Sequence, residues 1–297
     1  MTPTAARAQG PIVWGDMDQQ TLDDAYDQAK WASNQEIVTG RRGPASVEAL
    51  KYIAPPERHA YGPTEIEKLD IYRCKVPNAP VAIFVHGGAW RRGKASDFAY
   101  QAEMFVRAGA HHVVLDFASV DDMKGDLLAM AEQVRRAVAW VWKNAASFGG
   151  DPSRIYLTGH SSGAHLGGCA VMADLTRHGV PQDMLKGALL CSGIYELAPV
   201  RRSKRSEYVT FTDEIENELS AMRHIGRLAC PLVLAVGTNE SPEFIRQSHD
   251  FAAAVSTAGK QAGLIVAKNY NHFEIGETLA NPCGVLGRAA LKMMGLA

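Results

Sequence analysis

One stretch, residues 154–166 (RIYLTGHSSGAHL), restricts the fold more than any other part of this chain. The apolar β-type run from Ile155 to Thr158 leads directly into Gly-His-Ser-Ser-Gly, and a helix-compatible segment follows at once. The glycines on both sides of Ser161 let the strand and helix backbones approach closely. The pattern therefore predicts a strained serine, with an exposed hydroxyl, at the carboxyl end of a buried strand, where it can attack a carbonyl carbon.

Apolar runs alternate with helical segments on both sides of this turn. A continuous apolar run predicts a strand covered on both faces at residues 81–85, and further runs predict buried strands at 112–117 and 231–236. Strands are also predicted at 187–192 and 263–267, and the alternation of 67–74 predicts a half-buried edge strand. Helical periodicity predicts helices over about 98–108, 123–146 and 242–258, with Ser241 as the last helix's N-cap. This order predicts an α/β fold with a mostly parallel central sheet flanked by helices.

Length and composition indicate one large domain with two additions. The chain has 297 residues, of which 46% are hydrophobic and 21% charged, as in a globular protein with a sizeable core. We expect residues 1–60 to form an arm, with one amphipathic helix between Asp16 and Trp31, packed on a domain of residues 61–297. A charged region at about 196–228 is expected to be a small cap insertion. The arm would serve as a lid, as a contact in a homodimer, or as both.

Other classes of protein find little support in the sequence. A net charge of −1 gives no reason to expect nucleic acid or a membrane as partner, and no G-x-G-x-x-G or G-x-x-x-x-G-K-[ST] motif is present. The five cysteines form no C-x-x-C pair, which fits a reduced, cytoplasmic compartment. The first residues show no apolar signal-peptide region, and no apolar run reaches the roughly 18 residues that span a bilayer. We expect a small-molecule substrate and neither metal nor cofactor.

A serine nucleophile needs a base to take its proton and an acid to orient that base. In folds with this strand–turn–helix motif, both the acid and the base come after the serine in the chain. Three histidines come after the turn region: His224, His249 and His272. Only His272 directly follows the last predicted strand. Glu240 directly follows the preceding buried strand and is the predicted acid. Its competitor, Glu243, lies one turn into the next helix, where the alternative is a favourable charge at the helix N-terminus.

Backbone N–H groups are expected to bind the oxyanion of the tetrahedral intermediate. The His-Gly-Gly sequence at 86–88 follows an early buried strand, so Gly87 and Gly88 can bring their backbone close to the reacting carbonyl. Ser162, the residue after the nucleophile, is the second predicted donor. Loss of one such donor costs about 3 kcal/mol of transition-state stabilisation.

Two further features have alternative interpretations. Trp90 either lines the acyl pocket or packs in the core. The basic run Arg201–Arg205 is either a solvated face or the source of an arginine that meets a substrate carboxylate.

Several motifs resemble those of α/β-hydrolases of the kynurenine formamidase (arylformamidase) group, which is close to the H-G-G-x-W esterases. The matching stretches are 86–90, 159–166, 192–195, 240–248 and 271–273. The resemblance implies the α/β-hydrolase fold, Ser161 as nucleophile, His272 as base, and an oxyanion hole at Gly87, Gly88 and Ser162. It also implies that Tyr195 and Phe273 help to wall the pocket. Family members mostly carry Asp where Glu240 stands, and glutamate is an accepted substitute.

The activity that the resemblance implies is hydrolysis of a small acyl bond through an acyl-enzyme. The leading substrate class is an aryl formamide such as N-formylkynurenine. A carboxylesterase or amidase acting on other small esters or amides is the alternative. A non-catalytic ligand-binding protein of the same fold is a remote alternative, because it would be expected to lack part of the triad or of the oxyanion loop.

Overall fold

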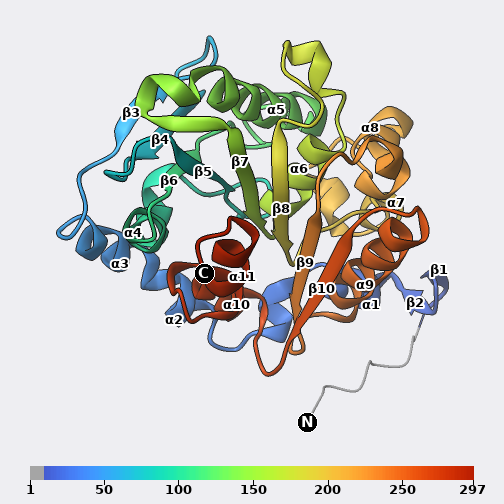
Figure 1. Ribbon diagram of the computed structural model, residues 1–297. Helices are drawn as coiled ribbons and strands as arrows, with labels where there is room; N and C mark the ends of the chain where they lie inside the picture. The colour runs from blue at the N-terminus through green and yellow to red at the C-terminus, as the bar shows by residue number, and fades with distance from the viewer. Residues whose placement is uncertain (1–9) are drawn as a thin grey trace.

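An eight-stranded sheet organises residues 10–297, which are the residues described by the computed structural model (Figure 1). Its strands are β3 (Glu57–Ala60), β4 (Lys68–Tyr72), β5 (Ala79–Val85), β6 (His111–Leu115), β7 (Gly150–His160), β8 (Leu185–Cys191), β9 (Leu232–Gly237) and β10 (Ala262–Ala267). Their order across the sheet is β10-β9-β8-β7-β5-β6-β4-β3. Only β4 runs antiparallel to its neighbours, β3 and β6. The predicted α/β architecture with a mostly parallel sheet is confirmed.

Helices cover both faces of the sheet, and the side chains of each strand alternate between two hydrophobic cores. One core packs α5 (Leu127–Asn144), α6 (Ser162–Val171) and α9 (Pro242–Thr257) on the sheet, and the other packs α4 (Ala102–Arg107) and α11 (Val285–Met293). In β5, Ile83 belongs to the first core and Phe84 to the second. This two-sided burial is why the parallel strands are continuously apolar in sequence. Ser241 caps α9 as predicted, accepting from the Phe244 N–H.

One strand prediction was wrong. Residues 67–74 were expected at an edge, but β4 is internal, because β3 pairs along its outer side. The polar residue that suggested a solvent face, Asp70, is buried and forms a 2.7 Å ion pair with Arg58 of β3. The last predicted strand is present as β10, which lies at the opposite edge of the sheet and is only partly buried, with Val266 46% exposed.

The N-terminal segment contains β1 (Ile12–Trp14), β2 (Met17–Asp18), α1 (Gln19–Ala25), a 3₁₀ turn (Gln28–Trp31), α2 (Gln35–Gly40) and α3 (Arg42–Ala49). The single helix expected between Asp16 and Trp31 is thus broken into two. The break lies at Asp27, whose side chain accepts from the Ala29 N–H and starts the 3₁₀ turn. Residues 1–9 of the predicted arm lie outside the described residues, and at the other end β3 belongs to the main sheet, so the arm ends before residue 57.

The segment between β8 and β9 contacts this arm directly. It contains α7 (Ala198–Arg201), a 3₁₀ turn (Lys204–Glu207), α8 (Asp213–Glu218) and a second 3₁₀ segment (Ala221–Arg227). The Lys204 ammonium forms a 2.7 Å ion pair with Asp27, and its backbone N–H donates to Asp23. Arg202 donates to the backbone oxygen of Val13. Arm and insertion therefore lie side by side. None of the helices in the described part of the chain is long and apolar enough to cross a membrane.

Candidate active site

Ser161 occupies a strained turn between β7 and α6, as the sequence predicts. Its backbone has φ 59° and ψ −128°, a region that residues other than glycine rarely adopt. Gly163, in the first turn of α6, shows why glycine is needed beside it, since a Cβ there would overlap the backbone oxygens of Val85 and His86. The helix can start directly against the end of β5 only because that Cβ is missing, and this holds the serine at the carboxyl edge of the sheet.

The residues predicted as nucleophile, base and acid form one hydrogen-bonded row. Nε2 of His272 lies 2.8 Å from Oγ of Ser161, and Nδ1 lies 2.7 Å from Oε2 of Glu240. A carboxylate only accepts hydrogen bonds, so Nδ1 carries the proton and Nε2 is left to accept from the serine hydroxyl. The side chains of His272 and Glu240 are 4% and 0% exposed, which keeps water from competing for their contact. Glu243, the competing acid, instead pairs with Arg246 at 2.6 Å.

The second oxygen of Glu240 is also held by the protein. Oε1 accepts from the Ser192 hydroxyl at 2.6 Å and from the Gly237 N–H at 2.7 Å. Ser192 directly follows β8 and has a positive φ of 54°, a strained backbone conformation for a residue other than glycine. From this position its hydroxyl reaches the Glu240 carboxylate. With three partners in all, the orientation of the Glu240 carboxyl group is fixed from both sides.

His160, immediately before the nucleophile, holds the backbone of His272. Its Nε2 lies 2.8 Å from the backbone oxygen of His272, to which it donates. Burial, and the repulsion that two protonated imidazoles would have at this distance from His272, hold the pKa of His160 well below its usual value. His160 therefore stays neutral at neutral pH, with the proton at Nε2 available for this bond.

The loop after β5 passes directly against the nucleophile. A Cβ on Gly87 would lie 2.9 Å from Cβ of Ser161 and 2.8 Å from the backbone oxygen of His160, so only glycine fits. Gly87 and Gly88 both line the pocket that contains Ser161. Ser162 is the first residue of α6, where a backbone N–H has no partner within the helix. All three predicted oxyanion donors thus lie beside the nucleophile.

Only one of the three aromatic residues predicted to bind substrate lines this pocket. Phe273 does, next to His272. Trp90 is 1% exposed and lies in the core, where its Nε1–H donates to Nδ1 of His165. Tyr195 is fully buried and stacks on Phe251 at 4.4 Å, so the prediction that it walls the pocket was wrong. The hydroxyl of Tyr195 is satisfied inside the core by the Leu190 backbone oxygen, which removes any need for a polar environment.

The pocket at Ser161 has a volume of about 670 Å³ and walls from three parts of the chain. The loop at Gly87 and Gly88 forms its floor with Ser161 and His272. The arm contributes residues of its helices and turns, among them Tyr26 and Arg42, and the insertion contributes Lys204, Arg205 and Tyr208. Residues far apart in sequence therefore decide what fits next to the nucleophile.

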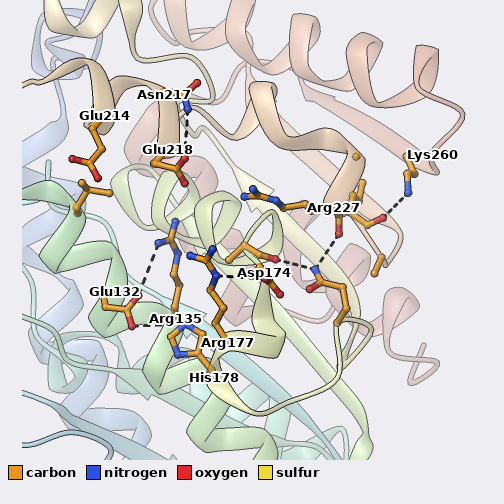
Figure 2. Close-up of a pocket in the computed structure, with 16 residues that line it drawn as sticks. Glu132, Arg135, Asp174, Arg177, His178, Glu214, Asn217, Glu218, Arg227 and Lys260 are labelled. Atoms are coloured by element: carbon orange, nitrogen blue, oxygen red, sulfur yellow. Dashed lines mark hydrogen bonds and ion pairs between the residues drawn. The ribbon is translucent and has the colours of Figure 1, made fainter.

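A second, larger hollow of about 880 Å³ shares no lining residue with this pocket (Figure 2). Acidic and basic side chains alternate around it, among them Glu132, Arg135, Asp174 and Arg177. None of the predicted site residues lines it. Size alone would favour this hollow, but only the smaller pocket contains a serine hydrogen-bonded to a histidine.

The sheet order, the strained serine at the end of β7 and the histidine and glutamate after later strands define a serine hydrolase of the α/β-hydrolase class. A protein from Silicibacter sp. TM1040 shares the fold, with a TM-score of 0.79 and 21% identity over 89% of this chain and 97% of that one. The BD-FAE family model matches residues 69–185.

Two sequence relatives narrow the class. The kynurenine formamidase of Danio rerio is 32% identical over 95% of this chain and 98% of its own length. The isoprenylcysteine alpha-carbonyl methylesterase ICME of Arabidopsis thaliana is 24% identical over 72% of this chain and 56% of its own. The chain belongs to the kynurenine formamidase family.

Sequence reasoning missed three contributors to the site. Ser192 and His160 hydrogen-bond to Glu240 and His272, but a serine after a strand or a histidine beside such a turn is also common without such contacts. Arg42 lies in the arm, where no motif connects it with residues more than a hundred positions later. The sequence did contain one sign of the roles of Ser192 and His160. Both residues lie at the carboxyl ends of strands, where parallel sheets form their ligand sites.

Proposed function

We propose that this protein is a cofactor-free formamidase that cleaves a small aryl formamide such as N-formylkynurenine into formate and the aryl amine. The observation that carries the proposal is the continuous row Ser161–His272–Glu240, with contacts of 2.8 and 2.7 Å. Similarity to a kynurenine formamidase along almost the whole chain supports the choice of bond.

In the first half of the reaction, Oγ of Ser161 attacks the formyl carbon while its proton passes to Nε2 of His272. Glu240 keeps Nδ1 protonated and stabilises the imidazolium that forms. The negative oxygen of the tetrahedral intermediate accepts from the backbone N–H groups of the Gly87–Gly88 loop and of Ser162. The carbon–nitrogen bond then breaks, and the leaving amine takes the proton from His272.

In the second half, water attacks the formyl ester on Ser161. His272 accepts a proton from this water and returns one to Oγ of Ser161 as formate leaves, so the enzyme ends as it began. The reaction needs no group beyond these residues, and a small-molecule substrate is the only partner the proposal requires. We place it in the cytoplasm, which is supported by the five cysteines of the chain all being free.

The second candidate is a carboxylesterase acting on short acyl esters, favoured by the similarity to a plant methylesterase. The same residues would cleave an ester, with an alcohol as leaving group. The test is kcat/KM for N-formylkynurenine beside p-nitrophenyl acetate and p-nitrophenyl butyrate. A formamide value several orders of magnitude below the ester values would overturn the formamidase in favour of the esterase.

A separate measurement tests whether Ser161 is a nucleophile at all. A fluorophosphonate probe should label the wild-type protein and should fail to label Ser161→Ala. Equal labelling of both, or no labelling of either, would favour a non-catalytic binding protein.

A further inference from the structure

Arg205 is a buried cation in the active-site pocket that has no anionic partner. The residue is 7% exposed, and its guanidinium lies 5.0 Å from the centroid of the Trp90 ring. Its two hydrogen bonds go to neutral groups, the backbone oxygen of Tyr26 at 2.9 Å and the hydroxyl of Tyr208 at 3.1 Å. No carboxylate in residues 10–297 forms an ion pair with it. Buried charges are rarely left unpaired, so this site is incomplete without an anion.

The other members of the basic run already have partners outside the pocket or at its rim. Arg201 forms ion pairs with Asp213 and Glu216 at 2.6 and 3.3 Å. Lys204 forms an ion pair with Asp27. Arg202 donates to the backbone oxygen of Val13 and does not line the pocket. Arg205 is therefore the arginine of this run that lines the pocket without an ion pair.

A second cation without an anionic partner lines the same pocket from the arm. Arg42 lies over the Phe98 ring, 5.6 Å from its centroid. It is close enough to His160, next to the nucleophile, for its positive charge to help lower the pKa of that histidine. Within the described part of the chain its guanidinium makes no hydrogen bond or ion pair. The arm and the insertion thus each bring one unpaired guanidinium to the pocket of Ser161.

The charges of all the residues that line the pocket also favour an anionic ligand. Five basic residues line the pocket (Arg42, Arg91, Arg92, Lys204 and Arg205) against two acidic ones (Asp27 and Asp97). Two of the basic residues are already balanced, Lys204 by Asp27 and Arg91 by Asp121, which leaves three basic residues against Asp97. A partly enclosed pocket with an excess of positive charge attracts an anionic substrate and holds it more strongly than water would.

We propose that Arg205 and Arg42 form a carboxylate subsite, so that the preferred substrate carries a carboxylate outside the bond that is cleaved. This deepens the proposed function and rests on it, since an aryl formamide would be held by its carboxylate while the formyl group meets Ser161. A guanidinium suits the task because its planar N–H donors match the two oxygens of a carboxylate. The subsite orients the leaving-group side of the substrate and takes no part in bond breaking.

The test compares two pairs of substrates that differ only in charge. N-formylkynurenine is paired with its carboxamide, and 4-acetoxybenzoate with 4-acetoxybenzamide. Wild type should cleave the carboxylates with the higher kcat/KM. Arg42→Gln and Arg205→Gln should each lower kcat/KM for the carboxylates by roughly 10- to 100-fold, mainly through KM, since a hydrogen bond to a charged group is worth about 1.5–3 kcal/mol. The ratio of kcat/KM for each carboxylate to kcat/KM for its carboxamide should fall as well.

Two further variants separate this role from a structural one. Arg205→Lys keeps the charge and should recover part of the ratio, whereas Arg201→Gln, in the same insertion but outside the pocket, should leave the ratio at its wild-type value. Arg42 lies on a half-exposed position of the arm, so its variant remains informative if Arg205→Gln does not fold. An unchanged ratio in Arg42→Gln and in a folded Arg205 variant would overturn the subsite.

The two substrate series also separate this proposal from the formamidase. Preference for 4-acetoxybenzoate that is lost in the arginine variants, without turnover of either formamide, would support the subsite and overturn the formamidase. Equal cleavage of N-formylkynurenine and its carboxamide by all variants would support the formamidase and overturn the subsite.

Discussion

The Ser192 hydroxyl donates a 2.6 Å hydrogen bond to Oε1 of Glu240, the carboxylate oxygen that faces away from His272. Removing it in Ser192→Ala should leave one oxygen of a buried carboxylate with only the Gly237 N–H. We expect kcat to fall about tenfold with KM nearly unchanged, because a hydrogen bond to a charged group contributes about 1.5–3 kcal/mol and part of it orients the acid. Ser248→Ala, an equally buried serine bonded to the Phe244 backbone, is the control. A Ser192 variant with wild-type kcat would contradict the role.

Glu240 and Glu243 should respond differently to loss of charge. Glu240→Gln should lower kcat by about 10⁴, because an amide donor facing Nδ1 favours the wrong tautomer of His272. Glu243→Gln should keep most of the activity, since Glu243 contacts Tyr26 and Arg246 rather than the histidine. Steady-state kinetics of both variants checks this, and the opposite order would show that the acid is misassigned.

A methyl group on Gly87 should disrupt the oxyanion loop. The Cβ of Gly87→Ala would lie under 3.0 Å from the backbone oxygen of His160 and from Cβ of Ser161, so the loop must shift away from the nucleophile. Loss of one donor alone corresponds to about 10²–10³ in kcat. In Gly40→Ala the added Cβ meets no atom within 4 Å, so kcat and the fluorophosphonate labelling of Ser161 should stay at wild-type values. Comparable activity in both variants would argue against this loop.

The arm should contribute to stability through Tyr26. Its hydroxyl donates to Glu243 at 2.7 Å and accepts from Gln247 at 2.9 Å, both in the core. Tyr26→Phe should lower the free energy of unfolding by about 1–2 kcal/mol, since buried polar groups lose a partner. Tyr52→Phe removes an exposed hydroxyl bond to Glu48 and should have little effect. Urea unfolding of both variants makes the comparison, and equal midpoints would mean that the arm is only loosely attached.

Buried histidines should make the protein sensitive to acid. Burial lowers the pKa of His112 to about 3 and that of His165 to about 4, whereas an unfolded chain titrates near 6.5. From pH 6.5 down to about 4 the unfolded state binds protons that the folded state does not, so stability is full above pH 6.5 and falls as pH drops. The slope is about 1.4 kcal/mol per pH unit for each such histidine.

His112→Phe tests this directly, since phenylalanine keeps the stacking on Phe105, whose ring centroid lies 4.5 Å away. The variant should lose stability less steeply than wild type between pH 6.5 and 4, as measured by urea unfolding. His249→Gln, at an exposed helix position, should keep the wild-type slope. An unchanged slope in His112→Phe would contradict the assignment.

The sequence predicted the elements whose signal is local. The turn at Ser161, the buried parallel strands and the places of His272 and Glu240 after their strands all follow from short-range patterns of apolar residues and glycines. What it could not predict depends on contacts between distant segments. The internal place of β4 rests on its pairing with β3, whose Arg58 balances the buried charge of Asp70, and Tyr195 is buried against Phe251 of the later helix α9. The walls of the pocket come from the arm and the insertion, whose sequences carry no motif for it.

The bond from His160 to the backbone of His272 makes the nucleophile and its base parts of one rigid unit. The residue next to Ser161 thus holds the loop of His272 from the sheet, and the arm also holds this loop, since Asn271 donates to Asn34. The arm also bonds to Ser241, the residue after Glu240, so a movement of the arm would act on His272 and Glu240 as well as on the wall of the pocket.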